Sequence, residues 1–261
     1  MSGNSQSDRK LAAVIMAAGQ GKRMKDPTRA KVMYELNGKP MIHYVADLAF
    51  SLGAQKVAVI IGHQREVVKE YVSKNHPSAT CVVQDPQLGT GHAVLQAGPV
   101  LAGFDGNVVV LSGDVPLLTK GTMERLIRHH SETAAVATIL TAVLDDPTGY
   151  GRIIRNSDRT VQGIVEHRDA TEEMRKISEI NSGIYVFDRE KLFGGLQQLM
   201  PNNAQGEYYL TDVFEYFWRN RWTVSAVVAE DVDEIHGINT FEQLEDRRRI
   251  LEARIAGVRT L

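Results

Sequence analysis

The chain has 261 residues, 43% of them apolar and 24% charged, which is enough to bury a sizeable core and argues against a disordered protein. The formal net charge is −2, and without a basic excess nucleic acid is not expected as a partner. A single cysteine excludes an internal disulfide, and no stretch reaches the roughly 18 apolar residues of a membrane span or forms a signal-peptide core. We therefore expect a cytoplasmic protein with no membrane partner.

The first half of the chain alternates between predicted strands and helices. After a polar tail over residues 1–10, continuous apolar runs predict buried strands, and apolar residues at helical spacing predict the helices between them. The predicted strands cover residues 11–16, 56–61, 80–84, 107–112 and 134–143. The predicted helices cover residues 41–52, 64–73, 90–97 and 123–130. This alternation with short connections predicts a doubly wound parallel sheet.

The second half of the chain changes character. Residues 150–155 and 160–166 predict an antiparallel pair of strands, and 179–187 and 222–228 predict two further strands. Helices are predicted at 189–200, 209–220 and 240–256. We therefore expect one Rossmann-like α/β domain over residues 11–261, with a doubly wound, mostly parallel mixed sheet. We divide it at 11–145, 146–239 and a C-terminal helix at 240–261.

A glycine-rich loop, Ala17–Met24, follows the first predicted strand. Gly19 and Gly21 allow the backbone to approach a phosphate closely. Local positive charge comes from Lys22, Arg23, Arg29 and Lys31. The spacing is not the dinucleotide fingerprint, whose third glycine would fall at Met24, and it is not the P-loop. By itself the loop therefore fits a phosphate grip and an ordinary glycine turn equally well.

Two later segments at strand ends carry groups that suit a nucleotide and its metal. Asp114 follows the predicted strand at 107–112. Its carboxylate can hold Mg²⁺, an ion that needs few oxygen ligands from the protein. The alternative is an aspartate that only stabilises a turn or caps a helix. Gln84 offers the donor and acceptor that a pyrimidine edge requires. Gly89 and Thr90 add backbone amides and a hydroxyl at a helix start, while His92 is expected to be structural.

Taken together, these segments resemble the sugar-nucleotide pyrophosphorylases. The resemblance is carried by residues 16–24, 84–93 and 113–116. Residues 146–153, 164–171, 179–183 and 203–212 narrow it to the N-acetylglucosamine-1-phosphate uridyltransferases. The match spans roughly residues 11 to 250 and implies the nucleotide-diphospho-sugar transferase type of fold.

The resemblance implies an Mg²⁺-dependent reaction of UTP with N-acetylglucosamine 1-phosphate, giving UDP-N-acetylglucosamine, a cell-wall precursor, and pyrophosphate. It implies that residues 11–145 bind the nucleotide and 146–239 the sugar. The catalytic residues would be Arg23 and Lys31, which brace the triphosphate, and Asp114, which holds Mg²⁺ together with Asn239. The other implied contacts are Ala17, Ala18, Gly19, Gln84, Gly89 and Thr90 for the nucleotide, and Gly151, Glu166 and Asn181 for the amino sugar.

Two residues depart from the family pattern. Ala30 stands where proline is usual before Lys31, and Ser112 stands where a tyrosine often precedes the Gly-Asp pair. The chain also has no hexapeptide repeat, so we expect neither acetyltransferase activity nor a trimer built on a β-helix, and the oligomeric state stays open.

Several alternatives stay open at this point. Another sugar 1-phosphate, or dTTP or CTP in place of UTP, would use the same groups. A non-catalytic nucleotide-binding domain is also compatible with this fold. A nicotinamide dehydrogenase is disfavoured by Met24. The eight histidines form no cluster with zinc spacing and no Gly-x-Ser-x-Gly elbow is present, so neither a structural zinc nor a hydrolase triad is expected.

Overall fold

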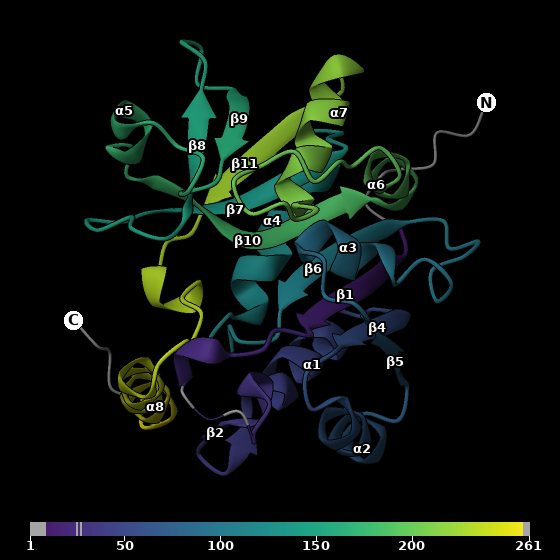
Figure 1. Cartoon of the computed structure of the whole chain (residues 1–261), viewed down its shortest axis with the longest axis vertical. Helices are drawn as coiled ribbons and strands as arrows, with labels where there is room; N and C mark the ends of the chain where they lie inside the picture. Colours follow the sequence, from purple (N-terminus) through teal and green to yellow (C-terminus); the bar gives the residue numbers. More distant parts are fainter. Residues whose placement is uncertain (1–8, 25, 27, 258–261) are drawn as a thin grey trace.

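A nine-stranded mixed sheet forms the centre of the molecule (Figure 1). The structure, a computed structural model, describes residues 9–257 except 25 and 27, so residues 1–8 of the expected tail lie outside it. The strands of this sheet are β1 (Leu11–Ala17), β4 (Lys56–Ile61), β5 (Ala79–Val83), β6 (Asn107–Ser112), β7 (Ala137–Val143), β8 (Gly151–Arg155), β9 (Val161–Val165), β10 (Glu179–Asp188) and β11 (Val224–Val228). A separate hairpin pairs β2 (Glu35–Leu36) with β3 (Lys39–Pro40).

The strand order is β11-β7-β10-β6-β1-β4-β5, with β8 paired to β10 and β9 paired to β8. The pairs β6–β1, β1–β4, β4–β5 and β7–β11 are parallel, which confirms the predicted mostly parallel mixed sheet. β10 lies antiparallel between β6 and β7, and the pairs β10–β8 and β8–β9 are antiparallel as well. The first-half strands therefore do not form one continuous parallel sheet as the alternation predicted.

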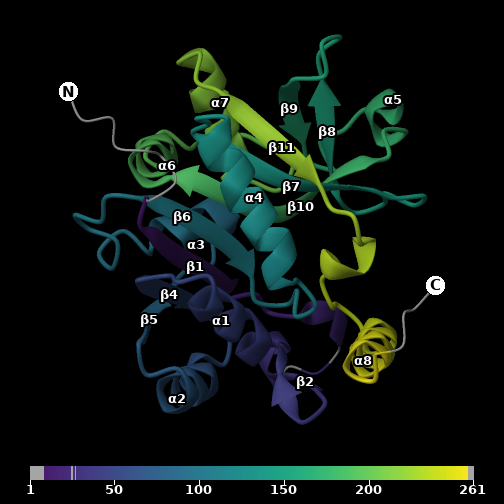
Figure 2. The ribbon, with the colours of Figure 1, turned by 180° about the vertical axis from the view of Figure 1, so that it is seen from behind.

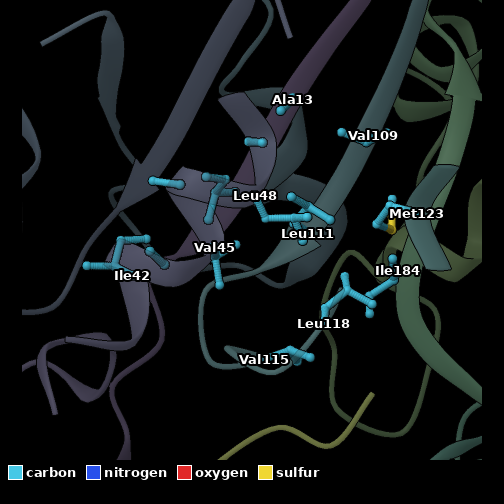
Figure 3. Close-up of a cluster of buried hydrophobic side chains, with 14 of the residues drawn as sticks. Ala13, Ile42, Val45, Leu48, Val109, Leu111, Val115, Leu118, Met123 and Ile184 are labelled. Atoms are coloured by element: carbon cyan, nitrogen blue, oxygen red, sulfur yellow. The ribbon is translucent and has the colours of Figure 1, made fainter. Parts of the chain in front are cut away.

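Helices cover both faces of the sheet. One face carries α1 (Met41–Ser51), α2 (Arg65–Asn75) and α4 (Lys120–Glu132), with α4 and α1 in front in Figure 2. The other face carries α3 (Thr90–Leu95), α6 (Arg189–Leu196) and α7 (Val213–Arg219). Successive residues of β1 pack to opposite sides, Ala13 and Ile15 into one core and Ala12 and Val14 into the other. Figure 3 shows the first of these cores, in which Val45 of α1 and Met123 of α4 pack on the sheet.

Most predicted elements are present, and the differences lie at their ends. Ala134 has a φ of 49°, a left-handed turn conformation, so β7 begins at Ala137 rather than at residue 134. A short 3₁₀ turn over Leu210–Asp212 precedes α7, which therefore begins at Val213. α6 ends at Leu196, four residues before the predicted end. The hairpin β2–β3 and α5 (Glu172–Arg175) were not predicted.

A third, smaller core joins the glycine-rich loop to the C-terminal part of the chain. Its buried residues are Met24, Tyr34, Leu36, Met41, Ile238 and Leu244. Leu244 belongs to α8 (Phe241–Ile255), whose first turn is capped by the Thr240 hydroxyl, which accepts from the Gln243 N–H. Met24 and Ile238 thus hold two distant loops beside each other. Among the described residues, no helix combines the length and the apolar character that a membrane crossing requires.

Candidate active site

Two adjoining cavities open near the carboxyl ends of β1 and β6. The first has a volume of about 550 Å³ and is lined by residues of the glycine-rich loop, of the segment after β5 and of the loops around Asp114 and Asn239. The second has a volume of about 190 Å³ and is lined by Gly151 of β8, by Glu166 directly after β9 and by residues of β10. Met16, Thr90 and Ser112 line both cavities, so one elongated ligand can reach from the first into the second. This is the edge at which open α/β sheets bind ligands.

The glycine-rich loop turns sharply against the segment that carries Lys31. Gly21 has a φ of 62°, and a Cβ at this position would lie 2.9 Å from the Lys31 Cβ, so only glycine fits without displacement. The Met24 N–H donates to the Gly21 carbonyl at 2.8 Å, and the Met24 side chain is buried in the third core. This anchoring sets Arg23 on the wall of the first cavity. The structure does not describe the Lys22 side chain, so the positive charge that Lys22 is expected to add to this loop stays a prediction.

The first cavity contains a compact charged group. The Lys31 ammonium forms an ion pair with the Asp114 carboxylate and donates a 2.8 Å hydrogen bond to Asn239 Oδ1. Arg23 Nη2 donates to the same Asn239 oxygen at 2.7 Å. The backbone joins these loops as well, because the Ile238 N–H donates to the Asp114 carbonyl at 2.9 Å. A carboxylate oxygen and an amide oxygen therefore converge on one cation.

The alanine before Lys31 does not redirect the loop. Ala30 has a φ of −63°, the value that a proline ring would impose, and its ψ of 134° is compatible with proline. Ala30 is also buried, and its carbonyl accepts from the Met33 N–H at 2.9 Å. The departure from the family pattern at this residue therefore leaves the path into Lys31 unchanged.

The segment after β5 presents a buried amide side chain to the first cavity. Gln84 Nε2 donates to the Gly89 carbonyl at 2.9 Å and lies 3.2 Å from His92 Nδ1. Because these contacts occupy Nε2, the Gln84 side-chain oxygen is the atom that can accept a hydrogen bond from a ligand. Gly89 has a φ of 114°, and a Cβ there would lie 2.6 Å from the Tyr208 carbonyl oxygen. His92 supports Gln84 from behind, and burial lowers the pKa of its imidazole.

The second cavity is built around a bulge in β10. Asn181 pairs with Gly151 of β8 and with Thr141 of β7, and the register then shifts before Tyr185. Asn181 Nδ2 donates to the Tyr185 hydroxyl at 2.7 Å, which fixes the buried amide. Because β10 runs antiparallel to β6, its first residues lie at the edge where β6 ends. Asn181 thereby comes close to Ser112, although 69 positions separate them in the chain.

Glu166 brings a carboxylate to the same cavity. Its Oε1 accepts from the Thr211 hydroxyl at 3.0 Å, and a Cβ on Gly151 would lie 3.4 Å from its Oε2. Burial, and to a smaller extent the neighbouring Asp169, raises the pKa of Glu166 above the ordinary glutamate value, against the lowering effect of the Thr211 hydrogen bond. Burial together with Glu166 also raises the pKa of Asp212 to about 6. The second cavity therefore holds one carboxylate, that of Glu166, which can accept hydrogen bonds from donors on a ligand.

All thirteen site residues predicted from the sequence line these two cavities. The first is lined by Ala17, Ala18, Gly19, Arg23, Lys31, Gln84, Gly89, Thr90, Asp114 and Asn239. The second is lined by Gly151, Glu166 and Asn181, and again by Thr90. The geometry is that of a two-part site with cations and a carboxylate at one end and neutral and acidic acceptors at the other.

Residues 12–234 match the family model described as nucleotidyl transferase. The chain belongs to this nucleotidyl transferase family. It is 49% identical over 246 residues to the bifunctional protein GlmU of Geobacillus thermodenitrificans, a match that covers 94% of this chain and 53% of the relative. The same protein of Listeria monocytogenes is 46% identical, with 94% and 53% covered. The chain therefore spans about half the length of the curated relatives that it matches.

Solved structures of other nucleotidyl transferases share the fold. A UDP-glucose pyrophosphorylase in complex with UDP-glucose superposes with a TM-score of 0.75 at 17% identity, covering 94% of this chain and 99% of that one. A Bacillus anthracis protein described as a candidate glucose-1-phosphate thymidylyltransferase, solved with sucrose, gives a TM-score of 0.71 at 23% identity, with 92% and 94% covered. At these identities the structural similarity establishes the fold of this chain and not its substrate.

Sequence reasoning assigned no role to Gln87, Tyr150, Glu207 and Thr211, which also line the cavities of this nucleotidyl transferase. Gln87 Nε2 donates to the Ala18 carbonyl at 2.5 Å and so supports the glycine-rich loop. Glu207 reaches the first cavity because the Tyr208 N–H donates to the Leu88 carbonyl at 2.8 Å. The segments containing these residues carry the family resemblance, but no local spacing indicates which of their side chains reach the site.

Proposed function

We propose that this chain is a UDP-N-acetylglucosamine pyrophosphorylase, which joins UTP to N-acetylglucosamine 1-phosphate and releases pyrophosphate. The observation that carries the proposal is the convergence of Asp114, Asn239, Lys31 and Arg23 beside the glycine-rich loop, next to a second cavity lined by Glu166 and Asn181. The relatives at 45–49% identity, all named as bifunctional protein GlmU, support the same activity. On this proposal residues 11–145 form the nucleotide-binding half and residues 146–239 the sugar-binding half.

Uracil would be recognised at the wall formed by the segment after β5. The Gln84 oxygen is oriented to accept a hydrogen bond, and the uracil ring offers one at its N3–H, whereas cytosine has an acceptor there. Gly89 and Thr90 lie beside this amide at the start of α3. A buried acceptor that faces another acceptor instead of a donor lowers the binding free energy by about 1–3 kcal/mol, so UTP should bind more tightly than CTP.

The donor set at Asp114 and Asn239 suits Mg²⁺. Both oxygens are hard ligands, and they already face one positive charge, the Lys31 ammonium. When bound, Mg²⁺ supplies charge neutralisation at the phosphate oxygens. On this proposal the Lys31 ammonium gives up its contacts with Asp114 and Asn239 when Mg²⁺ binds, and it contacts the triphosphate instead. Arg23 contacts the triphosphate from the glycine-rich loop.

The reaction needs no protein nucleophile. An oxygen of the sugar phosphate attacks the α-phosphorus of UTP, the bond from that phosphorus to the oxygen of the β-phosphate breaks, and pyrophosphate leaves. Lys31 and Arg23 neutralise charge on the leaving group, and the two cavities hold the reactants in line. In the second cavity the Glu166 carboxylate accepts hydrogen bonds from the sugar, and the Asn181 amide can donate to or accept from its hydroxyls and its acetamido group.

A pyrophosphate-release assay tests the proposal. The purified chain is incubated with Mg²⁺, each of UTP, dTTP and CTP, and each of N-acetylglucosamine 1-phosphate, glucose 1-phosphate and galactose 1-phosphate. We expect the highest kcat/KM for UTP with N-acetylglucosamine 1-phosphate. Release no faster than in the absence of protein, for every pair, would make this a non-catalytic binding domain, and a higher kcat/KM for another pair would reassign the substrate.

A further inference from the structure

Two histidines and an aspartate meet on α1 and at the end of α2, away from both cavities. His43 and Asp47 lie one turn apart on α1, and His76 follows the last residue of α2. His43 Nε2 lies 3.2 Å from Asp47 Oδ2, and His76 Nδ1 lies 3.7 Å from Asp47 Oδ1. One ligand atom from each of the three residues lies within 4.8 Å of the other two. None of the three lines either cavity of the candidate active site.

The neighbours of the two rings hold them in place. The Tyr71 hydroxyl lies 3.1 Å from His43 Nδ1, and the Phe50 ring stacks on His76 with centroids 6.1 Å apart. His76 is buried and His43 is nearly so, whereas the Asp47 side chain is 55% exposed. One nitrogen of each ring therefore faces the same carboxylate, and water can reach that carboxylate from outside.

Two imidazole nitrogens that face one carboxylate form a donor set suited to a metal ion. His43 Nδ1 lies 3.1 Å from the Tyr71 hydroxyl and 3.3 Å from His76 Nε2. The other nitrogen of each ring, His43 Nε2 and His76 Nδ1, faces Asp47. Burial lowers the pKa of the His76 imidazole, and Asp47 opposes this effect. Asp47, His43 and Lys39 act electrostatically on His76.

We propose that His43, Asp47 and His76 bind one divalent transition-metal ion of the Zn²⁺ type. Two imidazole nitrogens and one carboxylate are the donors that Zn²⁺ and Co²⁺ prefer, whereas Mg²⁺ prefers oxygen alone. Water completes a tetrahedral set on the exposed side of Asp47. The ion joins α1 to the chain that follows α2. Sequence spacing did not indicate the site, because His76 lies 33 positions after His43.

Cobalt titration tests the site on the full chain after chelator treatment and dialysis. With excess Mg²⁺ present, we expect one Co²⁺ per chain with the intense visible absorption of a tetrahedral complex, and competition by Zn²⁺. Asp47→Asn and His76→Gln are expected to weaken Co²⁺ binding at least about tenfold. Zn²⁺ is expected to raise the Tm of the unsubstituted chain and not that of Asp47→Asn.

Two further variants separate this site from other metal-binding groups. His129→Gln is the matched control, since His129 is a partly buried histidine on α4 that contacts Ser225 at 2.6 Å, and it should bind Co²⁺ as tightly as the unsubstituted chain. Asp114→Ala should also retain the tetrahedral signal. Because Asp47 is exposed, Asp47→Asn is expected to fold normally, and pyrophosphorylase activity with Mg²⁺ checks this. An unsubstituted chain without tetrahedral absorption, or an Asp47→Asn chain that binds Co²⁺ equally well, overturns the proposal.

Discussion

Asn239 accepts hydrogen bonds from two cations, Arg23 and Lys31, although it carries no charge itself. The only carboxylate in this group is that of Asp114, which pairs with Lys31. Two positive charges beside one negative charge leave a net positive region at the end of the first cavity. Such a region attracts a triphosphate, and it draws that ligand close to the two oxygens that suit a divalent cation. The anion and the cation then bind as one unit.

Replacing Asp114 tests whether this unit is required for catalysis. We expect Asp114→Ala to lower kcat about 100-fold or more, as removal of one strong transition-state stabiliser does, in the pyrophosphate-release assay. Asp105→Ala is the matched control, because Asp105 is exposed at the opposite end of the strand that precedes Asp114. A kcat equal to that of the control would remove Asp114 from the metal site.

Glu166 gives a prediction with a pH dependence. Its raised pKa means that it takes up a proton at a higher pH than an ordinary glutamate, and the proton removes an acceptor for a sugar hydroxyl. At about pH 8 we expect Glu166→Gln to lower kcat/KM for N-acetylglucosamine 1-phosphate about tenfold, the effect of one hydrogen bond to a charged group.

The difference between the two proteins should shrink as the pH falls from about 8 into the acidic range, because the glutamate of the unsubstituted chain becomes neutral as well. Titration of the sugar phosphate itself affects both proteins equally and cancels in the ratio. A ratio that stays constant over this range would mean that the charge of Glu166 plays no part in sugar binding.

Residues at strand ends could be found from the sequence, and contacts between distant loops could not. Asp114 and Gln84 each follow an apolar run, so the rule that ligands bind at the carboxyl ends of strands indicates both. The pairing of Lys31 with Asp114 depends instead on the close approach of Gly21 and on the burial of Met24 and Ile238. These tertiary contacts leave no local pattern in the sequence.

At the scale of elements, β10 decides how the two halves of the molecule are joined. Its first residues pair with β8 and its last residues pair with β6, so one strand belongs to both parts of the sheet. The sequence pattern predicted that β6, β8 and β10 exist, with ends correct to within a few residues. It could not predict their order, because an apolar run of the β10 kind fits a parallel or an antiparallel neighbour equally well.

The helix α4 carries a buried histidine that makes stability depend on pH. His130 is 2% exposed, and its Nδ1 lies 2.9 Å from the Thr138 hydroxyl of β7. Burial lowers its pKa to about 4, an effect larger than the opposing one of Asp188. The unfolded chain has an ordinary histidine pKa of about 6.5, so above this pH the neutral His130 does not reduce the stability of the fold. As the pH falls from about 6.5 toward about 4, the unfolded state takes up a proton that the folded state does not, and the free energy of unfolding decreases.

We therefore expect the free energy of unfolding to fall by about 3 kcal/mol from this group between about pH 6.5 and pH 4. His130→Gln keeps a polar partner for Thr138 but cannot gain a proton, so its urea-unfolding free energy should fall less over this range. His129→Gln on the same helix serves as the control and should follow the unsubstituted chain. Parallel pH profiles for all three proteins would contradict the assignment to His130.

At the scale of the whole molecule, the three cores hold a site to which both halves contribute. The two large cores clamp the sheet between helices, and the third core joins the glycine-rich loop to α8 and to the loop of Asn239. The residues shared by the two cavities, Met16, Thr90 and Ser112, come from β1, α3 and β6. A ligand that fills both cavities therefore contacts each part of the sheet at once.

Thermal unfolding measures this connection directly. On the proposed function, UDP-N-acetylglucosamine with Mg²⁺ at about 100 times its Kd should stabilise the chain by about 2.7 kcal/mol and raise the Tm by roughly 5–10 °C. UDP and N-acetylglucosamine added as separate molecules at the same concentrations should raise it less, because only the linked ligand brings the sugar into the second cavity without a separate loss of translational freedom. Glu166→Gln, which changes only the second cavity, should reduce the shift for the linked ligand and leave that for UDP unchanged. Equal shifts for UDP and for UDP-N-acetylglucosamine would show that the second cavity does not hold the sugar.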